Sequence, residues 1–297
     1  MRQLRHSPLF ILRSVFCIAL AVMLSFAETV SGAVLYVKAD ATGAANGSSW
    51  TDAYTTISSA ISAAADCDTI YVAKGVYVEK LTISKSLTIY GGFPGLSMDE
   101  TLADRDPEAY QAVVTPSTAA QTSAVWQHVE PNVDSYSLTT ANTTTPLIGS
   151  DGTVKLPSFT GDYDSWVSSA SVSATMIYAN GVCTNRVDGL WLVNGTQWIQ
   201  NGNGAVTTVA NCNFIGGGTG GSIAGYDSSN AIGKYLCMTN CLFFGAKMKV
   251  GRGGFLLTKG GDYLFDDCRI VGFVNDGYDV NYGGSIVYYW SGTKNFV

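Results

Sequence analysis

The residues best suited to carry out chemistry lie in the C-terminal part of the chain, where acidic and basic side chains are close in sequence. Asp266, Asp267 and Asp276 lie near Arg252 and Arg269. Two carboxyl groups that flank a glycosidic bond can act as general acid and general base in its hydrolysis, if their separation suits the bond. These five residues are the candidate catalytic group. A structural role is the main alternative, because Asp267 falls in a repeated turn and Asp276 precedes a glycine.

Aromatic side chains form a second candidate group, which is suited to binding. The chain contains 16 tyrosines and 6 tryptophans. They gather near the C-terminus at Tyr278, Tyr282, Tyr288 and Trp290. Flat apolar rings with polar edges suit the faces of sugars, so a row of exposed rings would bind an extended polysaccharide. The alternative is that alternate rings face inward and belong to the core.

Cysteines supply the remaining reactive groups. Of 7 cysteines, Cys17 lies in the N-terminal segment, and the others allow fifteen disulfide connectivities without naming one. Cys212, Cys241 and Cys268 each follow Asn or Asp. We expect these three to be stacked free thiols in the core, because buried cysteine behaves as a small hydrophobic residue. His128 is the single histidine after the N-terminal segment, so no metal site is predicted.

An internal repeat predicts the elements that position these residues. The segments ANCNFIGG, TNCLFFGA and DDCRIVGF carry the three cysteines at intervals of 29 and then 27 residues. An earlier copy, VDGLWLVNG, is expected to place Asp188 in the Asn position and Gly189 in the Cys position. A second repeat has two glycines before a short strand, near residues 220, 253 and 283. Repetition at such periods indicates a solenoid, here of about ten coils with roughly 25 residues each.

The residue types in the repeat predict how one coil stacks on the next. Short strands separated by Gly, Asn and Asp turns can stack in parallel about 4.8 Å apart, so that backbone hydrogen bonds join the coils and alternate side chains fill the interior. Asn at a repeated turn can adopt the left-handed conformation and bond to the Asn of neighbouring coils. The predicted fold class is all-β, a right-handed parallel β-helix solenoid that forms a single domain over residues 34–297.

An N-terminal cap is predicted over residues 34–68. Asp52 is the expected N-cap of an α-helix, and apolar residues follow at helical spacing, namely Tyr54, Ile57, Ala60, Ile61 and Ala64. Such a helix would cover the open end of the solenoid, where strand edges and core side chains are otherwise exposed.

Residues 115–170 break the repeat and are predicted to form an irregular insertion between coils, either a plain surface loop or one that lines a groove.

The first 33 residues are predicted to be a signal peptide. Three arginines precede the uncharged apolar run Val15–Ala27, which is short for a membrane span and typical of an export signal. Cleavage before Glu28 and cleavage before Val34 both fit, and a membrane anchor is the alternative. No later stretch is apolar enough to span a membrane, so we expect a secreted or cell-surface protein. Because the chain ends at Val297 directly after a strand-like segment, a truncated C-terminal end is also expected.

The charge of the chain limits its partners. The formal net charge is −6, and no cluster of Lys and Arg follows residue 13. Nucleic acid is therefore excluded as a predicted partner, because phosphate binding needs clustered basic residues. The expected partner is a polysaccharide or a cell-surface glycan, bound by a monomer.

Three ordered motifs resemble a known family. The order SSWTDAYTTISSAISAAADCDTIYVAKGVY, then LTIYGGFPG, then DRDP, looks like the N-terminal end of secreted bacterial right-handed β-helix proteins of the pectate-lyase-like superfamily. The later GGS, NC and DGL repeats are similar to those of polymorphic outer-membrane proteins. Together these motifs cover most of the chain after the export signal. The resemblance implies the fold, export and a surface or extracellular role.

The resemblance leaves the activity open, because this fold hosts lyases, hydrolases, adhesins and passive stalks. Lyases of this kind use acidic residues to hold calcium on the substrate and an Arg or Lys to remove a proton, so calcium is implied only if the protein is a lyase. The related hydrolases combine adjacent aspartates with a Gly-His-Gly turn and an Arg-Ile-Lys strand. Here Asp266 and Asp267 are adjacent, but no histidine follows His128, and Val271 follows Arg269 and Ile270, which disfavours hydrolysis.

The function predicted from the sequence is binding of extracellular polysaccharide or cell-surface glycans. One alternative is a polysaccharide lyase or glycoside hydrolase of the same fold. Another is a structural stalk or the passenger fragment of an adhesin. Whether the protein is an enzyme stays undecided at this point.

Overall fold

The computed structural model describes most of the chain after the predicted signal peptide. The described residues are 32–117, 124–132, 137–157, 165–169, 172–202, 204–217, 223–225, 235–245, 247–249, 256–258, 262–271, 274–276 and 287–289. Residues 1–31 of the predicted signal peptide, with the cleavage site before Glu28, lie outside these ranges, whereas the alternative cleavage site before Val34 lies within them.

Three parallel sheets form the body of the structure. Sheet A contains, in spatial order, β1 (Val34–Val37), β2 (Thr69–Ala73), β5 (Thr88–Phe93), β11 (Thr184–Asp188), β14 (Val206–Ala210), β17 (Tyr235–Thr239) and β21 (Asp262–Asp266). Sheet B contains β3 (Gly75–Val78), β6 (Ala112–Thr115), β12 (Leu190–Val193), β15 (Asn213–Ile215), β18 (Leu242–Phe244) and β22 (Arg269–Val271). Sheet C contains β4 (Leu81–Ile83), β10 (Val172–Ala179), β13 (Gly195–Asn201), β16 (Ile223–Gly225), β20 (Leu256–Thr258) and β24 (Val287–Tyr289).

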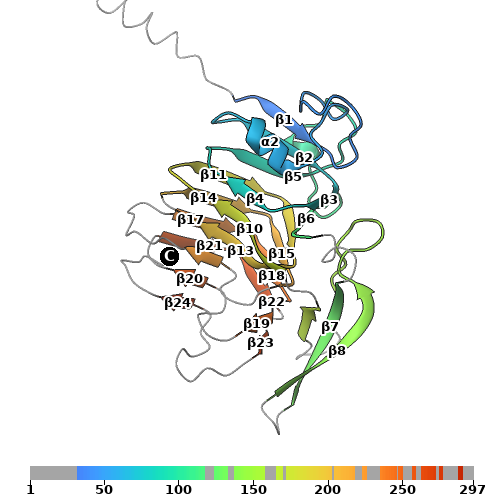
Figure 1. Ribbon diagram of the computed structural model, residues 1–297, viewed down its shortest axis with the longest axis vertical. Coiled ribbons are helices and arrows are strands. Elements are labelled where there is room, and N and C mark those ends of the chain that lie inside the picture. The colour runs from blue at the N-terminus through green and yellow to red at the C-terminus, as the bar shows by residue number, and fades with distance from the viewer. Residues whose placement is uncertain are drawn as a thin grey trace, which may run out of the picture. The chain divides into compact units, whose positions relative to one another are not determined.

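The chain visits the three sheets in rotation, which makes it a parallel β-helix. Each strand pairs in parallel with the equivalent strand of the next coil, and Figure 1 shows the strands succeeding one another in chain order. This confirms the predicted parallel β-helix, and a right-handed sense is expected because nearly all parallel crossovers are right-handed. The described residues form six coils rather than the ten predicted, since sheets B and C have 6 strands each. The predicted number of coils was too high because the N-terminal cap, the loop between β5 and β6 and the insertion after β6 contain many residues without adding coils.

The turns between sheets A and B form a column of left-handed residues. Gly189, Asn211, Asn240 and Asp267 have φ angles of 77°, 51°, 48° and 48°. They are on successive coils, because the strands on both sides of them pair in register. Glycine and asparagine tolerate this backbone conformation better than other residues do. The recurring Asn and Asp therefore occupy equivalent turn positions, as the repeat predicted.

Asparagine side chains in this column bond to one another. Nδ2 of Asn240 donates to Oδ1 of Asn211 over 2.8 Å, and Nδ2 of Asn211 donates to Oδ1 of Asp188 over 3.0 Å. This confirms the predicted bonding between neighbouring coils. We call these three residues, together with Asp267, the amide ladder.

One register within the repeat was predicted wrongly. Asp188 pairs with Ala210, so Gly189 rather than Asp188 is the counterpart of Asn211. The reason is that Gly189 supplies the positive φ angle that the turn requires. The side chain of Asp188 joins the amide ladder from the position directly before the turn residue Gly189.

The predicted column of free thiols is present. Cys212, Cys241 and Cys268 each follow a left-handed residue on three successive coils, and all three belong to or pack against the main core. Cys212 and Cys241 are buried, whereas Cys268 is half-buried. Each of the three is a free thiol.

The strands that follow the second repeat lie on successive coils. Its glycines lie outside the described residues, but the strands that follow them are β16, β20 and β24, which are neighbours in sheet C. Ile223 pairs with Leu256, and Leu256 pairs with Val287. The glycine pairs therefore precede equivalent strands on successive coils.

Replacing Asp267 with asparagine is expected to stabilise the protein. Asn240 uses its amide nitrogen on Asn211, so its oxygen is left for the next coil, where a carboxylate cannot donate to it. An amide at position 267 can donate, and we expect the free energy of unfolding to rise by about 1 kcal/mol. Urea unfolding checks this, with Asp266→Asn on the adjacent, exposed residue as the control. An equal effect of both substitutions would contradict the prediction.

The interior of the coils is filled by aliphatic side chains and stacked rings. The rings of Phe214 and Phe243 lie 4.8 Å apart and nearly parallel, and Trp198 lies 5.6 Å from Phe214. Trp50, Trp126, Trp191 and Trp198 are all buried. Only Trp198 of these four belongs to the main core, as the inward-facing interpretation requires, whereas Trp126 and Trp191 belong to a second buried cluster and Trp50 to a third.

A short helix, α2 (Ile57–Ala63), packs against β1, β2 and β4 and covers the N-terminal end of the core (Figure 1). The predicted apolar positions Ile57, Ala60 and Ile61 are buried. The N-cap is Thr56, not Asp52, and its side chain accepts from Ser59 N.

The N-cap was misplaced because the chain is still extended three residues before the helix. Tyr54 forms a parallel bridge with Val37, which a helical residue could not do. Asp52 instead accepts from the backbone N–H of Ala44 over 2.8 Å and so stabilises the loop before the helix.

In the described part of the chain, no helix has the length and apolar character that crossing a membrane requires.

The segment predicted to be an irregular insertion follows β6 and precedes β10. In the residues described, it contains three antiparallel strands, β7 (Val125–Asn132), β8 (Ser137–Pro146) and β9 (Ser165–Ser168). Trp126 anchors it, because its buried ring lies 5.3 Å from Phe244 of sheet B and its Nε1 donates to Lys155 O over 2.7 Å. The last two coils add the parallel pair β19 (Lys247–Lys249) and β23 (Val274–Asp276).

Candidate functional site

The structure brings together only part of the predicted catalytic group. Asp266 ends β21, Asp267 follows it in the turn, and Arg269 begins β22, so all three lie on one coil and are exposed. Asp276 lies in β23, where the backbone pairs with Lys249, and its side chain is not among those described. Arg252 lies outside the described residues.

Most of the predicted binding residues also lie outside the described part of the chain. Tyr278, Tyr282 and Trp290 are not described. Tyr288 has a described backbone in β24, where it pairs with Leu257 of sheet C. This register position lies in the same column of sheet C as Tyr178.

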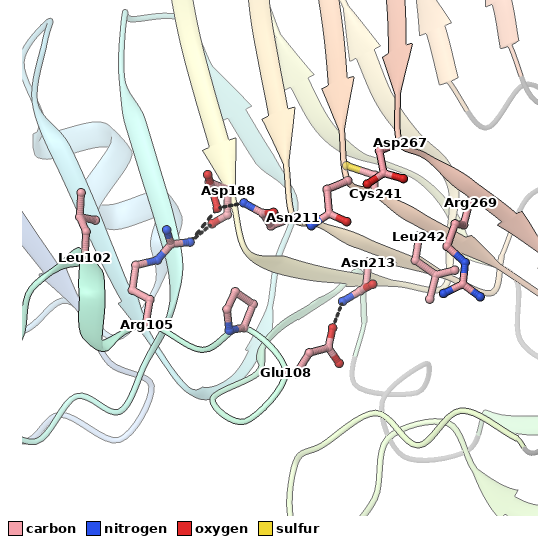
Figure 2. Close-up of a pocket in the computed structure, with 12 residues that line it drawn as sticks. Leu102, Arg105, Glu108, Asp188, Asn211, Asn213, Cys241, Leu242, Asp267 and Arg269 are labelled. Atoms are coloured by element: carbon pink, nitrogen blue, oxygen red, sulfur yellow. Dashed lines mark hydrogen bonds and ion pairs between the residues drawn. The ribbon is translucent and has the colours of Figure 1, made fainter.

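A groove follows the turns between sheets A and B, and we call it the corner groove. It has a volume of about 600 Å³. The loop between β5 and β6, which includes the 3₁₀ helix η1 (Leu102–Asp104), forms one wall, and successive coils form the rest (Figure 2). Its lining residues are Leu102, Arg105, Pro107, Glu108, Asp188, Asn211, Asn213, Asn240, Cys241, Leu242, Asp267 and Arg269.

A nearly buried ion pair fastens the loop wall to the coils. Nη2 of Arg105 lies 2.8 Å from Oδ1 of Asp188, and the two side chains are only 11% and 3% exposed. Nε of Arg105 donates to Gly91 O over 2.7 Å, and its guanidinium lies 4.6 Å from the ring centre of Tyr90. Nη2 of Arg186 lies 2.5 Å from the other carboxylate oxygen of Asp188. Figure 2 shows Arg105 and Asn211 converging on Asp188.

The electrostatics of Asp188 point to a structural role. Burial alone would raise its pKa, but the hydrogen bonds from Arg105 and Asn211, the charge of Arg105 and the bond from Arg186 hold the pKa below its ordinary value. Asp188 is therefore an anion at neutral pH, and its oxygens are already occupied by donors. It shapes the corner groove and is poorly suited to accept a proton from a substrate.

The far end of the corner groove carries charged groups that are more accessible. Glu108 accepts from Nδ2 of Asn213 over 3.0 Å, while Asp267 and Arg269 are exposed. Asp267 has the left-handed turn conformation that its structural interpretation requires. Asp266 does not line the groove. Among the residues described, no three His, Cys, Asp or Glu side chains come together as a metal site would require.

A second groove lies on the outer face of sheet C, across β4, β10 and β13, and we call it the sheet C groove. Its volume is about 470 Å³. It is lined mainly by neutral polar side chains, with one tyrosine and one lysine, and the full set is Lys80, Thr82, Ala174, Thr175, Tyr178, Thr196, Gln197 and Gln200.

Strand alternation places these side chains on the outside. Tyr178 is half-buried and lies between the buried residues Ile177 and Ala179, and Gln200 likewise lies between two buried residues. Thr82, Tyr178 and Gln200 pair in register and form one column across three coils. The same column continues through Ala224 and Leu257 to Tyr288.

The residues of the sheet C groove were not predicted from the sequence. The signal that could have found them is the alternation of MIYA at 176–179 and WIQN at 198–201, in which a polar or amphipathic residue interrupts buried ones. This signal is short, and neither segment carries the Asn-Cys or Gly-Gly motif that defined the repeat.

Comparison with models of protein families and with curated proteins found no match for this chain.

Proposed function

We propose that this protein is exported and binds extended extracellular polysaccharides along the outer face of sheet C. The observation that carries the proposal is the column of Thr82, Tyr178 and Gln200 within an open groove of about 470 Å³. The sequence supports export through the predicted signal peptide.

The chemistry of the groove suits a sugar polymer. The Tyr178 ring offers a flat apolar surface, and the neighbouring amides and hydroxyls offer both donors and acceptors, as sugar hydroxyls require. Oγ1 of Thr175 donates to Oε1 of Gln197 over 2.7 Å, which orients that amide. Because coils repeat about every 4.8 Å, the surface is repetitive and rigid, and it suits a repetitive ligand.

Replacing Tyr178 with alanine is expected to weaken polysaccharide binding about fivefold, since a ring contact contributes on the order of 1 kcal/mol. The measurement is retardation in native gels that each contain one polysaccharide from a panel of neutral and uronate-rich polymers. Tyr235→Ala is the matched control, because Tyr235 is also half-buried but lies on sheet A. Circular dichroism of each variant verifies that it is folded.

Two outcomes would contradict the proposal. One is that no polysaccharide retards the wild-type protein, which would favour the stalk or adhesin alternative. The other is that Tyr178→Ala and Tyr235→Ala weaken binding equally, since the site would then lie elsewhere.

A second candidate function is polysaccharide cleavage, which is favoured by the joint position of Asp267 and Arg269 in the corner groove. Incubation of acidic polysaccharides with the protein and added calcium distinguishes it. Release of unsaturated uronides or of new reducing ends would assign the protein to the lyases or hydrolases. Calcium is the cofactor only in the lyase case.

A further inference from the structure

Cys241 and Cys268 are held opposite each other on adjacent coils. The backbone N–H of Asn240 donates to Asp266 O over 3.0 Å, and that of Arg269 donates to Cys241 O over 2.8 Å, so hydrogen bonds tie the two coils on both sides of the cysteines. Strands paired in this way lie about 4.8 Å apart. Disulfides usually join residues whose Cα atoms are about 4.4–6.8 Å apart, so the spacing of the coils suits one.

Each sulfur lies against a carbonyl oxygen of the preceding coil, Cys241 Sγ at 3.7 Å from Val209 O and Cys268 Sγ near Met238 O, so the Cys268 sulfur leans toward the coil that carries Cys241. Sγ of Cys241 lies 3.3 Å from Thr239 O, and Sγ of Cys268 lies 3.5 Å from Asp266 O and 3.4 Å from Met238 O. The interaction between the two neighbouring thiols lowers the pKa of Cys268 and raises that of Cys241. Cys268 is therefore the first of the pair to ionise, and a thiolate is the reactive form of cysteine.

Access distinguishes this pair from the third thiol of the column. Cys268 is half-buried, and Cys241 lines the corner groove, where Figure 2 shows its side chain among the groove residues. Cys212 is fully buried, and burial raises its pKa to about 12. A reagent at the surface thus reaches Cys268 first, with Cys241 on the adjacent coil behind it, and does not reach Cys212.

We propose that Cys241 and Cys268 are a dithiol pair that closes to a disulfide between adjacent coils by exchange with a small-molecule disulfide such as oxidised glutathione. The Cys268 thiolate attacks one glutathione sulfur, the glutathione disulfide breaks, and the departing thiolate takes up a proton. Cys241 then loses its proton and attacks the Cys268 sulfur, which releases the second glutathione. The two cysteines are oxidised, and one oxidised glutathione is reduced to two thiols.

The experiment treats the folded, purified chain with oxidised glutathione, blocks the remaining thiols with N-ethylmaleimide and maps the products by mass spectrometry after proteolysis. In the wild-type protein, we expect the Cys241 and Cys268 peptides to be joined. In Cys241→Ser, we expect glutathione to stay attached at Cys268, because no resolving thiol remains. In Cys268→Ser, we expect Cys241 to be modified at least tenfold more slowly than Cys268 is in Cys241→Ser.

Cys237→Ser is the matched control, because Cys237 is also half-buried and lies in the neighbouring strand β17. It should leave the joined peptide unchanged. The proposal is overturned if the wild-type protein accumulates only a glutathione adduct at Cys268, if Cys241 joins Cys212 instead, or if both thiols stay reduced while exposed Cys67 reacts. None of these outcomes depends on polysaccharide binding, so the proposed function is tested separately.

Discussion

Replacing Asp188 with alanine is expected to lower the free energy of unfolding by about 3–5 kcal/mol, because it leaves the nearly buried Arg105 guanidinium without its carboxylate. The substitution also removes the acceptor of Asn211 Nδ2 and of Arg186. Urea unfolding followed by circular dichroism measures the change. Few single substitutions in this protein should cost more.

Two further variants make this prediction specific. Asp188→Asn keeps the size of the side chain but loses its charge, so we expect an intermediate loss. Asp40→Ala is the control, because Asp40 is 83% exposed and lies 3.9 Å from Lys38, a contact expected to contribute less than about 1 kcal/mol. If Asp188→Ala and Asp40→Ala destabilise the protein to the same extent, the ion pair does not fasten the loop as the structure implies.

The contribution of Asp188 should also depend on pH in a defined direction. Its pKa is lower in the folded protein than its ordinary value of about 3.9, so the folded state holds the ionised form more strongly than the unfolded state does. This stability is fully present above about pH 4 and is lost as the pH falls through the lower, folded pKa. The difference in unfolding free energy between wild type and Asp188→Asn should therefore be smaller at about pH 2.5 than at pH 7.

Replacing Phe214 with alanine is expected to cost about 3–5 kcal/mol of unfolding free energy. Its ring is fully buried and packs against both Trp198 and Phe243, at 5.6 Å and 4.8 Å between ring centres. Removal of the ring leaves a cavity at the centre of the stack, and flanking strands held by inter-coil hydrogen bonds cannot collapse into it. Thermal unfolding measures the effect.

The same column supplies a matched control for Phe214. Ile270 is two coils further along in the same register, through Phe243, but is 45% exposed. Ile270→Ala should therefore cost less than about 1.5 kcal/mol, because little apolar surface leaves water at this position. A loss at Phe214 no larger than that at Ile270 would mean that the ring stack does not dominate the core.

Much of the fold was predictable because its signals are local. The left-handed turns favour glycine, asparagine and aspartate, so Asn211 and Asn240 mark equivalent turns in the sequence itself. The cysteines that follow them were placed on successive coils for the same reason. The register at Asp188 was assigned wrongly because both an aspartate and a glycine are common in turns, and only the φ angle of Gly189 decides between them.

The grooves were less predictable because their residues are distant in sequence. Tyr178 and Gln200 are neighbours only because β10 and β13 pair in one register, and neither residue is unusual in its own segment. Of the candidate catalytic residues, Asp267 and Arg269 do share a groove, yet Asp267 has the conformation of a turn residue. Proximity in sequence identified the group but not its geometry.

The sequence by itself determined the period of the coils, the positions of the turns and the column of thiols, since a repeated backbone conformation selects the same few residue types each time. Only the tertiary structure decided that Arg105 would meet Asp188 across 83 residues and that the two grooves would have their particular linings. The physical reason is that such contacts depend on how far each loop departs from the repeat before the chain returns to the next coil. The local conformational preferences of the residues do not specify that distance.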